Sequence, residues 1–193
     1  MKIVFATNNA HKLAEVQAVL GEGYTLLTPR DCGVAEEIPE TQQTLEGNAS
    51  QKARYLYDRT GLDCFADDTG LEVAALGGAP GVRSARYATD GHDIAANNRL
   101  LLANLEGVAD RRARFRTVIS LILGGRERLF EGVVEGRIAE RETGAEGFGY
   151  DPLFVPEGSE RTFAEMTAAE KNAVSHRARA VRKLAEYLYN LNK

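Results

Sequence analysis

Cysteine is scarce in this chain, with only Cys32 and Cys64 among 193 residues. Their spacing is not that of a metal-binding motif. Two cysteines could form one bridge, but nothing in the sequence indicates a disulfide framework. We therefore expect a reduced, cytoplasmic setting. Long apolar runs are also missing. The first run, residues 2–6, is too short for a secretion signal, and none approaches the roughly 20 residues of a membrane span. We expect no association with a membrane.

An excess of positive charge is the third absence. The chain has 24 Lys and Arg against 28 Asp and Glu, and its formal net charge is −4. Because duplex-binding proteins are usually basic overall, nucleic acid is not an expected partner, although a local basic pocket is compatible with this balance. The hydrophobic content of 44% is ordinary for a globular protein. At this length we expect a single domain, residues 1–193, made of two packed lobes.

Short apolar runs and helical periods alternate along the chain. Strands are expected at residues 2–6, 24–27, 64–66, 71–73, 115–123, 129–134, 136–139 and 153–155. Helices are expected after the polar loop at residues 7–12, from about Thr44 to Arg59, from about His92 to Leu105, after Thr167 and from Ser175. In the helix after His92, the expected core positions are Ile94, Leu101 and Leu105, and His92 itself is expected at the surface.

An acidic pair follows the apolar run at residues 64–66. Asp67 and Asp68 come directly after it, then Thr69 and Gly70. Gly70 predicts a sharp reversal, because glycine has no Cβ to resist one. Two carboxylates at the end of a strand suit Mg²⁺, which binds hard oxygen ligands and usually takes only one or two carboxylates from the protein. An ordinary Asp-Asp-Thr-Gly turn explains the stretch equally well.

The N-terminal loop has the features of an anion site. Residues 7–12, Thr-Asn-Asn-Ala-His-Lys, stand between a predicted strand and a predicted helix, whose free N–H groups favour negative charge. The loop lacks the glycines of a Walker motif, and plain helix capping remains the alternative. Asn48 and Lys52 share one helix face, either as solvated residues or with Lys52 reaching the same phosphates as Lys12. Glu40 is a candidate for a second metal carboxylate.

Two further stretches indicate a binding site. Phe148-Gly149-Tyr150-Asp151 holds two aromatic rings on a turn, which suits stacking on a nucleobase at about 1–3 kcal/mol, although rings packed under a loop are commoner. His176 and Arg177 fall in the first turn of the last predicted helix, where cations oppose the helix dipole. That placement indicates an anion or acceptor beside them.

Together these stretches resemble the RdgB/inosine triphosphate pyrophosphatase family. The resemblance rests on residues 7–12, 46–49, 66–71, 77–87, 147–152, 170–172 and 175–177, in the family's order and over nearly the whole chain. The departures are Asn8, where the family often has a smaller residue, and Thr69, where it has Ser. The family implies an α/β fold with an elongated mixed β-sheet, flanking helices and two lobes around a central active-site cleft. It also implies a homodimer and Mg²⁺-dependent hydrolysis of non-canonical purine triphosphates (ITP, dITP, XTP) to monophosphate and pyrophosphate, which prevents their incorporation into DNA and RNA.

The resemblance also implies a role for each site residue. The triphosphate would be held by Thr7, Asn8, Asn9, Ala10, His11, Lys12 and Lys52, with Thr69 touching the substrate. Mg²⁺ would be held by Glu40 and Asp68, and Asp68 would also activate the attacking water, with Asp67 in support. The base would lie against Phe148, Gly149 and Tyr150, with Asp151, Lys171, His176 and Arg177 along its polar edge. Arg177 is the expected donor to the 6-oxygen.

Two other functions compete with this interpretation. A Maf-like nucleotide pyrophosphatase would act on pyrimidine or modified nucleotides, and the residues at 148–151 and 175–177 argue against it. The second is a non-catalytic nucleotide- or RNA-binding module. The intact acidic pair and the net charge of −4 argue against it.

Overall fold

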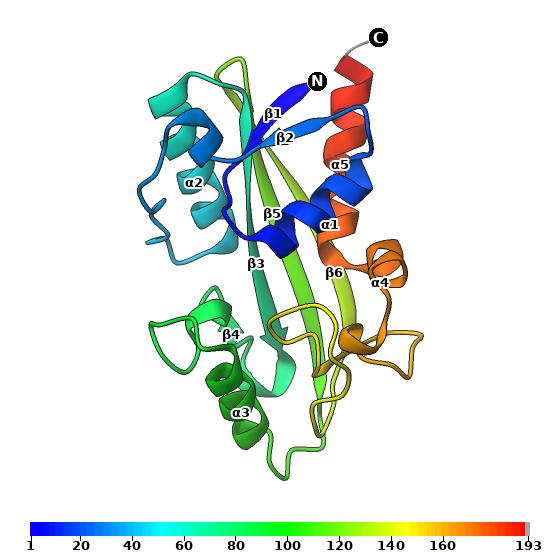
Figure 1. Ribbon diagram of the computed structural model, residues 1–193. Coiled ribbons are helices and arrows are strands. Elements are labelled where there is room, and N and C mark those ends of the chain that lie inside the picture. Colours follow the sequence, from blue (N-terminus) through cyan, green and yellow to red (C-terminus); the bar gives the residue numbers. More distant parts are fainter. Residues whose placement is uncertain (192–193) are drawn as a thin grey trace. The chain divides into compact units, whose positions relative to one another are not determined.

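The computed structural model describes residues 1–191, and these residues form two compact units built from alternating segments of the chain (Figure 1). Unit 1 comprises Met1–Asp68, Thr117–Gly132 and the chain from His176; unit 2 comprises Thr69–Arg116 and Val133–Ser175. The chain passes from one unit to the other four times: inside the three long strands β3 (Cys64–Val73), β5 (Arg112–Leu123) and β6 (Arg126–Ile138), and between Ser175 and His176. The boundary at Asp68 and Thr69 therefore falls within the acidic stretch.

The sheet contains seven strands in the order β2-β1-β3-β5-β6-β7, with β4 paired to β3. β1 (Lys2–Phe5) is parallel to both β2 (Thr25–Leu27) and β3. β4 (Pro80–Gly81) and β7 (Phe154–Pro156) are antiparallel to β3 and β6. The predicted fold class, a mixed sheet with flanking helices, is confirmed.

In unit 1 the helices are α1 (Ala10–Leu20), α2 (Leu45–Thr60) and α5 (His176–Leu191), with a short 3₁₀ turn at Arg30–Cys32. Successive residues of β1 point to opposite faces of the sheet and both faces are covered. Ile3 and Phe5 pack with the apolar sides of α1 and α5, which lie side by side (Figure 1). Val4 packs with Ala53 and Leu56 of α2. Phe5 also stacks on Phe65 of β3, with ring centroids 4.5 Å apart.

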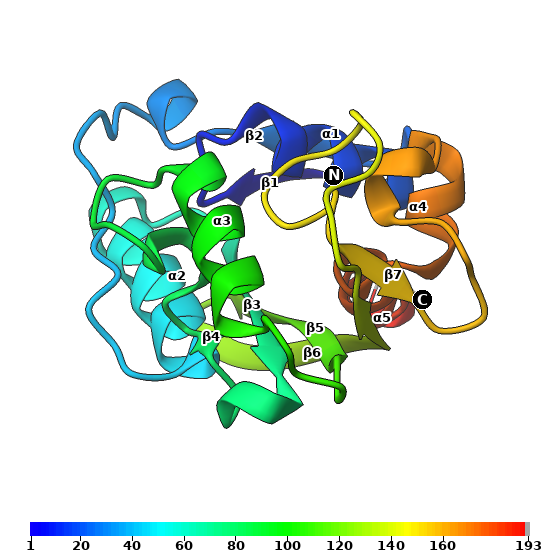
Figure 2. The same cartoon turned by 90° about the horizontal axis from the view of Figure 1, so that it is seen from below.

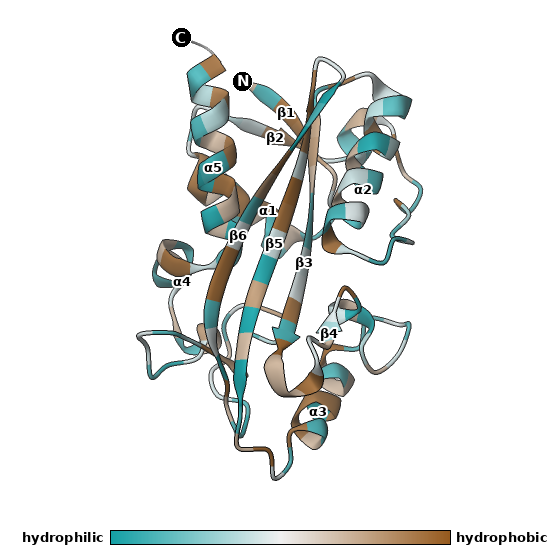
Figure 3. Cartoon of the chain, turned by 180° about the vertical axis from the view of Figure 1, so that it is seen from behind, coloured by the Kyte–Doolittle hydropathy of each residue, from teal (hydrophilic) through white to brown (hydrophobic). Residues whose placement is uncertain are grey.

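In unit 2 the helices are α3 (Ile94–Asn104) and α4 (Ala168–Val174), with 3₁₀ turns at Ala74–Leu76, Ser84–Arg86 and Phe163–Glu165. The hydropathy colouring in Figure 3 shows brown segments along α3 and the strands beside it. The core joins Leu71 and Leu101 to three aromatic rings, Phe115, Phe154 and Phe163. A reciprocal capping box, Thr167 with Glu170, starts α4 as its sequence predicts.

Three sequence-based expectations are wrong. No reversal occurs at Gly70, because β3 runs from Cys64 to Val73 and the backbone N–H of Leu71 donates to Ser84 Oγ at 2.8 Å. Residues 129–134 and 136–139 belong to one strand, β6. Gly136 does not interrupt it; a Cβ there would lie 2.3 Å from Val155 O, so the glycine instead admits β7.

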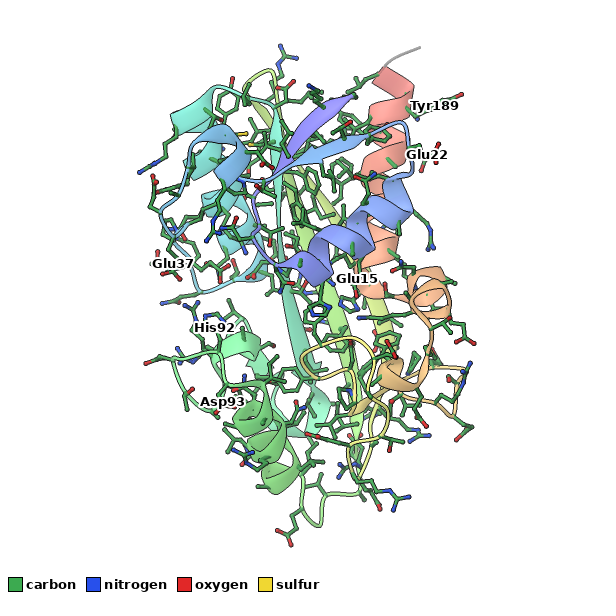
Figure 4. The ribbon with its side chains drawn as sticks, in the orientation of Figure 1. Glu15, Glu22, Glu37, His92, Asp93 and Tyr189 are labelled. Carbon is green, nitrogen blue, oxygen red and sulfur yellow. The ribbon has the colours of Figure 1, made fainter. Side chains whose placement is uncertain are left out.

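The third error concerns α3. Ile94 is 49% exposed, although its position predicted a core residue. The helix buries Asn97, Asn98 and Leu101 instead. His92 and Asp93 lie at the exposed start of this helix (Figure 4), where Asp93 accepts the N–H of Ala96 as its N-cap. Leu101 and Leu105 are fully buried, as expected. Within residues 1–191 no helix has the length and apolar character needed to cross a membrane.

Candidate active site

The loop before α1 is shaped by its own side chains. Asn9 is the N-cap of α1, and its Oδ1 accepts the backbone N–H groups of His11 and Lys12 at 3.0 and 3.2 Å. Thr7 Oγ1 accepts the N–H of Asn9 at 3.2 Å. Residues 8–11 are exposed, whereas Lys12 is half-buried and turns toward β3. Capping therefore describes Asn9, and the helix N-terminus with Lys12 remains suited to an anion.

Asp67 joins two basic side chains that are far apart in the sequence. Its Oδ1 accepts Lys12 Nζ at 2.9 Å, and its Oδ2 accepts Arg177 Nε at 3.1 Å. Arg177 is 2% exposed and also contacts Glu15, which projects from α1 (Figure 4). The acceptor that the sequence indicated beside the start of the last helix is thus a pair of carboxylates, Asp67 and Glu15.

Asp68 points to a different set of partners. Its Oδ2 accepts Asn48 Nδ2 at 3.1 Å, and its Oδ1 lies 3.4 Å from Lys52 Nζ. Lys52 also donates to Glu40 Oε1 at 2.7 Å, so one ammonium contacts both predicted metal carboxylates. Asn48 and Lys52 are 2% and 4% exposed, which excludes the solvated helix face as an explanation.

The segment that carries Glu40 is held against α2 by side-chain contacts. Asn48 Oδ1 accepts the N–H of Gln42 at 2.9 Å, and Gln51 Oε1 accepts the N–H of Thr41 at 2.9 Å. A Cβ on Gly47 would lie 2.8 Å from Gln42 Cβ, so glycine permits this approach. Asn48 therefore links the segment beside Glu40 to Asp68.

The two adjacent aspartates differ in protonation. Burial alone would raise the pKa of Asp67, but Lys12, Arg177 and Lys52 overcome it and hold that pKa well below the ordinary range. The pKa of Asp68 is raised, first by burial and then by the charge of Glu40, although Lys52 acts against the shift. Asp67 is thus a fixed anion, and Asp68 is the better proton acceptor of the two.

The lysines differ in the same way. Burial lowers the pKa of Lys12, and the charges of Lys52 and Arg177 add to that effect against the attraction of Asp67. For Lys52 burial also acts downward, but Asp68, Glu40 and Asp67 together raise its pKa. Lys52 therefore stays protonated and positively charged beside these three carboxylates.

The residues around Lys52 fit a divalent cation. Glu40 and Asp68 converge on one ammonium, and the negative charge of Glu40 disfavours ionised Asp68, a repulsion that a cation between them relieves. Within residues 1–191 no group of three or more His, Cys, Asp or Glu side chains gathers as a metal cluster. Two carboxylates are nevertheless enough for Mg²⁺, since water and substrate phosphate usually complete its coordination.

Unit 2 holds a second group of predicted site residues. Asp151 Oδ2 accepts Lys171 Nζ at 2.6 Å and the backbone N–H of Phe148 at 2.9 Å. The ammonium of Lys171 lies 5.0 Å from the centroid of the Phe148 ring, within reach of a cation–π contact. A Cβ on Gly147 would lie 2.1 Å from Asp151 Oδ2, so this turn requires glycine. The half-buried ring of Phe148 is therefore held by a buried ion pair.

Tyr150 has a different environment from Phe148. It is 5% exposed, packs in the core of unit 2 and donates its hydroxyl to Ser84 O at 2.7 Å. Burial raises the pKa of this hydroxyl well above its ordinary range, so the group stays protonated. Packing under a loop, the commoner fate of such rings, describes Tyr150, while Phe148 keeps partial exposure.

The structure thus brings the predicted residues together in two groups. Lys12, Glu40, Lys52, Asp67, Asp68, His176 and Arg177 belong to unit 1; Thr69, Phe148, Gly149, Tyr150, Asp151 and Lys171 belong to unit 2. Sequence reasoning missed the contact of Glu15 with Arg177 and the polar roles of Ser84, Asn97 and Asn98. Glu15 stands three residues after Lys12 on one helix face, which is the one sequence signal that could have indicated it.

On the central strand β3 of this mixed sheet, the adjacent carboxylates of Asp67 and Asp68 lie against the ammonium groups of Lys12 and Lys52. Residues 3–187 match the Ham1 family. A dITP/XTP pyrophosphatase of Flavobacterium johnsoniae is 50% identical over 97% of this chain and 98% of its own length. The structure of a HAM1 protein from Coxiella burnetii has 40% identity and a TM-score of 0.90, over 98% of this chain and 99% of that one. The Ham1 protein of Staphylococcus aureus has 35% identity and a TM-score of 0.89 over the same shares. The chain belongs to the Ham1 family, and the predicted resemblance is confirmed.

Proposed function

We propose that this chain hydrolyses dITP, ITP and XTP to the nucleoside monophosphate and pyrophosphate. It is an enzyme of the XTP/dITP diphosphatase class, and its relatives carry the name dITP/XTP pyrophosphatase. The observation that carries the proposal is the charge centre of unit 1, in which Lys12 and Lys52 face the adjacent carboxylates of Asp67 and Asp68. By removing such triphosphates, the enzyme would keep them out of DNA and RNA.

The triphosphate is assigned to unit 1. It carries about four negative charges, which must be neutralised before water can approach phosphorus. Lys12, Lys52 and the N-terminus of α1 supply positive charge and N–H donors. Glu40 and Asp68 would hold Mg²⁺, which when bound supplies charge neutralisation and Lewis acidity. Asp67, bonded to Lys12 and Arg177, positions both cations rather than acting as the base.

Asp68 is assigned the role of general base. Its raised pKa makes it the stronger proton acceptor of the pair, and Asn48 orients its carboxylate. A water molecule that gives its proton to Asp68 attacks the α-phosphorus. The bond from that phosphorus to the bridging oxygen breaks, and pyrophosphate leaves with the bonding electrons. Thr69, the next residue of β3, would touch the substrate beside this centre.

The base is assigned to Phe148 by stacking, with Lys171 beside that ring. Arg177 is the donor to the 6-oxygen that the resemblance implies. Asp151 holds Lys171, and Asp67 with Glu15 holds Arg177. Adenine carries an amino group where hypoxanthine and xanthine carry oxygen, so it would leave a buried donor unpaired. This mismatch supports a preference for 6-oxopurines over adenine.

The test is pyrophosphate release with Mg²⁺ from dITP, XTP, dGTP, dATP and dTTP side by side, with and without chelator. We expect fast, chelator-sensitive turnover of dITP and XTP alone. Turnover of dTTP instead would support a Maf-like pyrophosphatase. Nucleotide binding without turnover under any metal condition would leave a binding module as the function.

The resemblance carries two further proposals about the protein in the cell. A homodimer is expected, which light scattering of the purified protein tests directly. A monomer at micromolar concentration would contradict it. A cytoplasmic location is also proposed, and fractionation of the producing cells would test it.

A further inference from the structure

Helix α3 buries two adjacent amides where an apolar face would be expected. Asn97 and Asn98 are 3% and 2% exposed, while Ile94 of the same helix is 49% exposed. Burying an amide is unfavourable unless it forms hydrogen bonds. An apolar pair would pack there without that requirement, so the bonds these amides form give the reason for their presence.

Asn97 is bonded to the loop that follows β4. Its Oδ1 accepts the N–H of Ala88 at 2.7 Å, and its Nδ2 donates to Ala85 O at 3.0 Å. The same loop is held by Ser84, whose Oγ accepts the N–H of Leu71 and whose carbonyl accepts the hydroxyl of Tyr150. The loop is therefore a fixed support inside unit 2.

Asn98 is bonded to a different loop. Its Nδ2 donates to Gly149 O at 3.2 Å, 51 residues along the chain. Figure 2 shows α3 in green beside the yellow segment that contains this loop. Gly149 stands between Phe148 and Tyr150 in a left-handed conformation with φ +64°, and a Cβ on it would meet no atom within 4 Å. The amide of Asn98 therefore gives the Gly149 carbonyl a hydrogen bond that orients this peptide.

The oxygen of the Asn98 amide, Oδ1, indicates that the side chain is oriented by the hydrogen bond that Nδ2 donates. Within residues 1–191 its Oδ1 is buried and accepts no hydrogen bond. Turning the amide over would place that oxygen against Gly149 O, with two acceptors facing each other. The side chain thus leaves one polar atom unsatisfied in order to make one bond to Gly149, which is a poor arrangement for stability alone.

We propose that Asn98 is a positioning residue for base recognition: it fixes the Gly149 carbonyl and thereby the loop that presents the ring of Phe148. The proposal deepens and rests on the proposed function, because the base is assigned to Phe148. Tyr150 on one side of Gly149 is anchored to Ser84, and Phe148 on the other side is anchored through its N–H to Asp151. Asn98 holds the peptide between these two anchors.

The first experiment compares N98A with N104A, the matched control. Asn104 is exposed on the same helix and bonds Tyr87 OH rather than the Gly149 loop. We expect N98A to raise the KM for dITP by about fivefold or more, the effect of one lost hydrogen bond, with kcat within about twofold of wild type. N104A should leave both constants unchanged. If N98A lowered kcat and thermal stability while KM stayed the same, Asn98 would be merely structural and the proposal would be wrong.

The second experiment needs no turnover. The chain has no tryptophan, so F148W places a single fluorescent reporter at the proposed ring. Adding N98A to F148W should shift the emission to the red and lower its anisotropy, and adding N104A should not. Equal emission in the three proteins would overturn the proposal. If the wild-type protein failed to hydrolyse dITP, the proposed function would fall, and this fluorescence comparison alone would decide whether Asn98 fixes the loop.

Discussion

Replacing Gly132 with alanine should damage the charge centre of unit 1 without touching any of its charged residues. Gly132 lies on β6, and an added Cβ there would meet the backbone at the start of α5. An added Cβ would lie 2.0 Å from His176 O and 2.5 Å from Ala180 N, whereas real Cβ contacts are essentially never under 3.0 Å. The first turn of α5 must therefore move by about 1 Å or more, and it carries Arg177, whose Nε is 3.1 Å from Asp67.

The size of the effect follows from this displacement. Overpacking a buried site costs about 1–3 kcal/mol of unfolding free energy. For a protein of this length each 1 kcal/mol lowers Tm by about 2–4 °C, so we expect a drop of about 2–12 °C. A misplacement of about 1 Å can lower activity by about 10²-fold. We expect kcat/KM for dITP to fall by about 10- to 100-fold.

The assays are scanning calorimetry and pyrophosphate release, with two control variants. Around Gly23 the space for a Cβ is open, so G23A should match wild type in both assays. Gly136 lies on the same strand as Gly132, and a Cβ there would lie 2.3 Å from Val155 O, away from α5. G136A should lose comparable stability and keep more activity. Wild-type Tm and kcat/KM in G132A would refute the reasoning.

Three further predictions concern single side chains. D68N should lower kcat by more than about 10²-fold with an unchanged Tm, because it removes the proposed base; near-normal turnover in the pyrophosphate assay would remove Asp68 from that role. G147A should raise the KM for dITP more than it lowers kcat, because its Cβ would lie 2.1 Å from Asp151 Oδ2 and displace the partner of Lys171; an unchanged KM would contradict the assignment of Lys171 to the base. Hydrogen bonds from Arg161 and from the N–H of Thr167 lower the pKa of Glu170 from 4.5 to about 2, so its contribution to stability is present above about pH 4.5 and is lost as the pH falls toward 2. Urea unfolding from pH 2 to 6 should therefore give wild type a larger free energy of unfolding than E170Q near pH 6, and equal values near pH 2. If the difference between the two free energies did not change with pH, Glu170 would contribute nothing through this ionisation.

Local periodicity predicted most of the elements correctly. The helices expected from about Thr44 to Arg59 and after Thr167 are α2 and α4, and both follow from spacings of three and four residues. Family membership also followed from short motifs in order, and the comparisons confirm it. These features depend on neighbours within one turn of helix or one strand, which is why they can be predicted from the sequence.

The prediction of a turn at Gly70 failed because glycine permits a reversal without requiring one. Whether the chain turns there depends on what lies beside β3, and Ser84 supplies a hydrogen bond to the extended strand. The prediction that Ile94 lies in the core failed for a related reason. Asn97 and Asn98 form hydrogen bonds with loops that lie elsewhere in the chain. The spacing of apolar residues along α3 therefore cannot show that amides are buried on this face of the helix.

The sequence by itself determined which charged residues could serve a phosphate centre, because the residue types and their order along the chain were enough to indicate them. Only the tertiary structure decided which carboxylate faces which cation. Asp67 and Asp68 are neighbours, yet one pairs with Lys12 and Arg177 and the other with Lys52 and Asn48. Successive side chains of a strand point to opposite sides, and burial and nearby charge then shift their pKa values in opposite directions. Such through-space effects have no counterpart in sequence spacing, since Asp67 and Arg177 stand 110 residues apart.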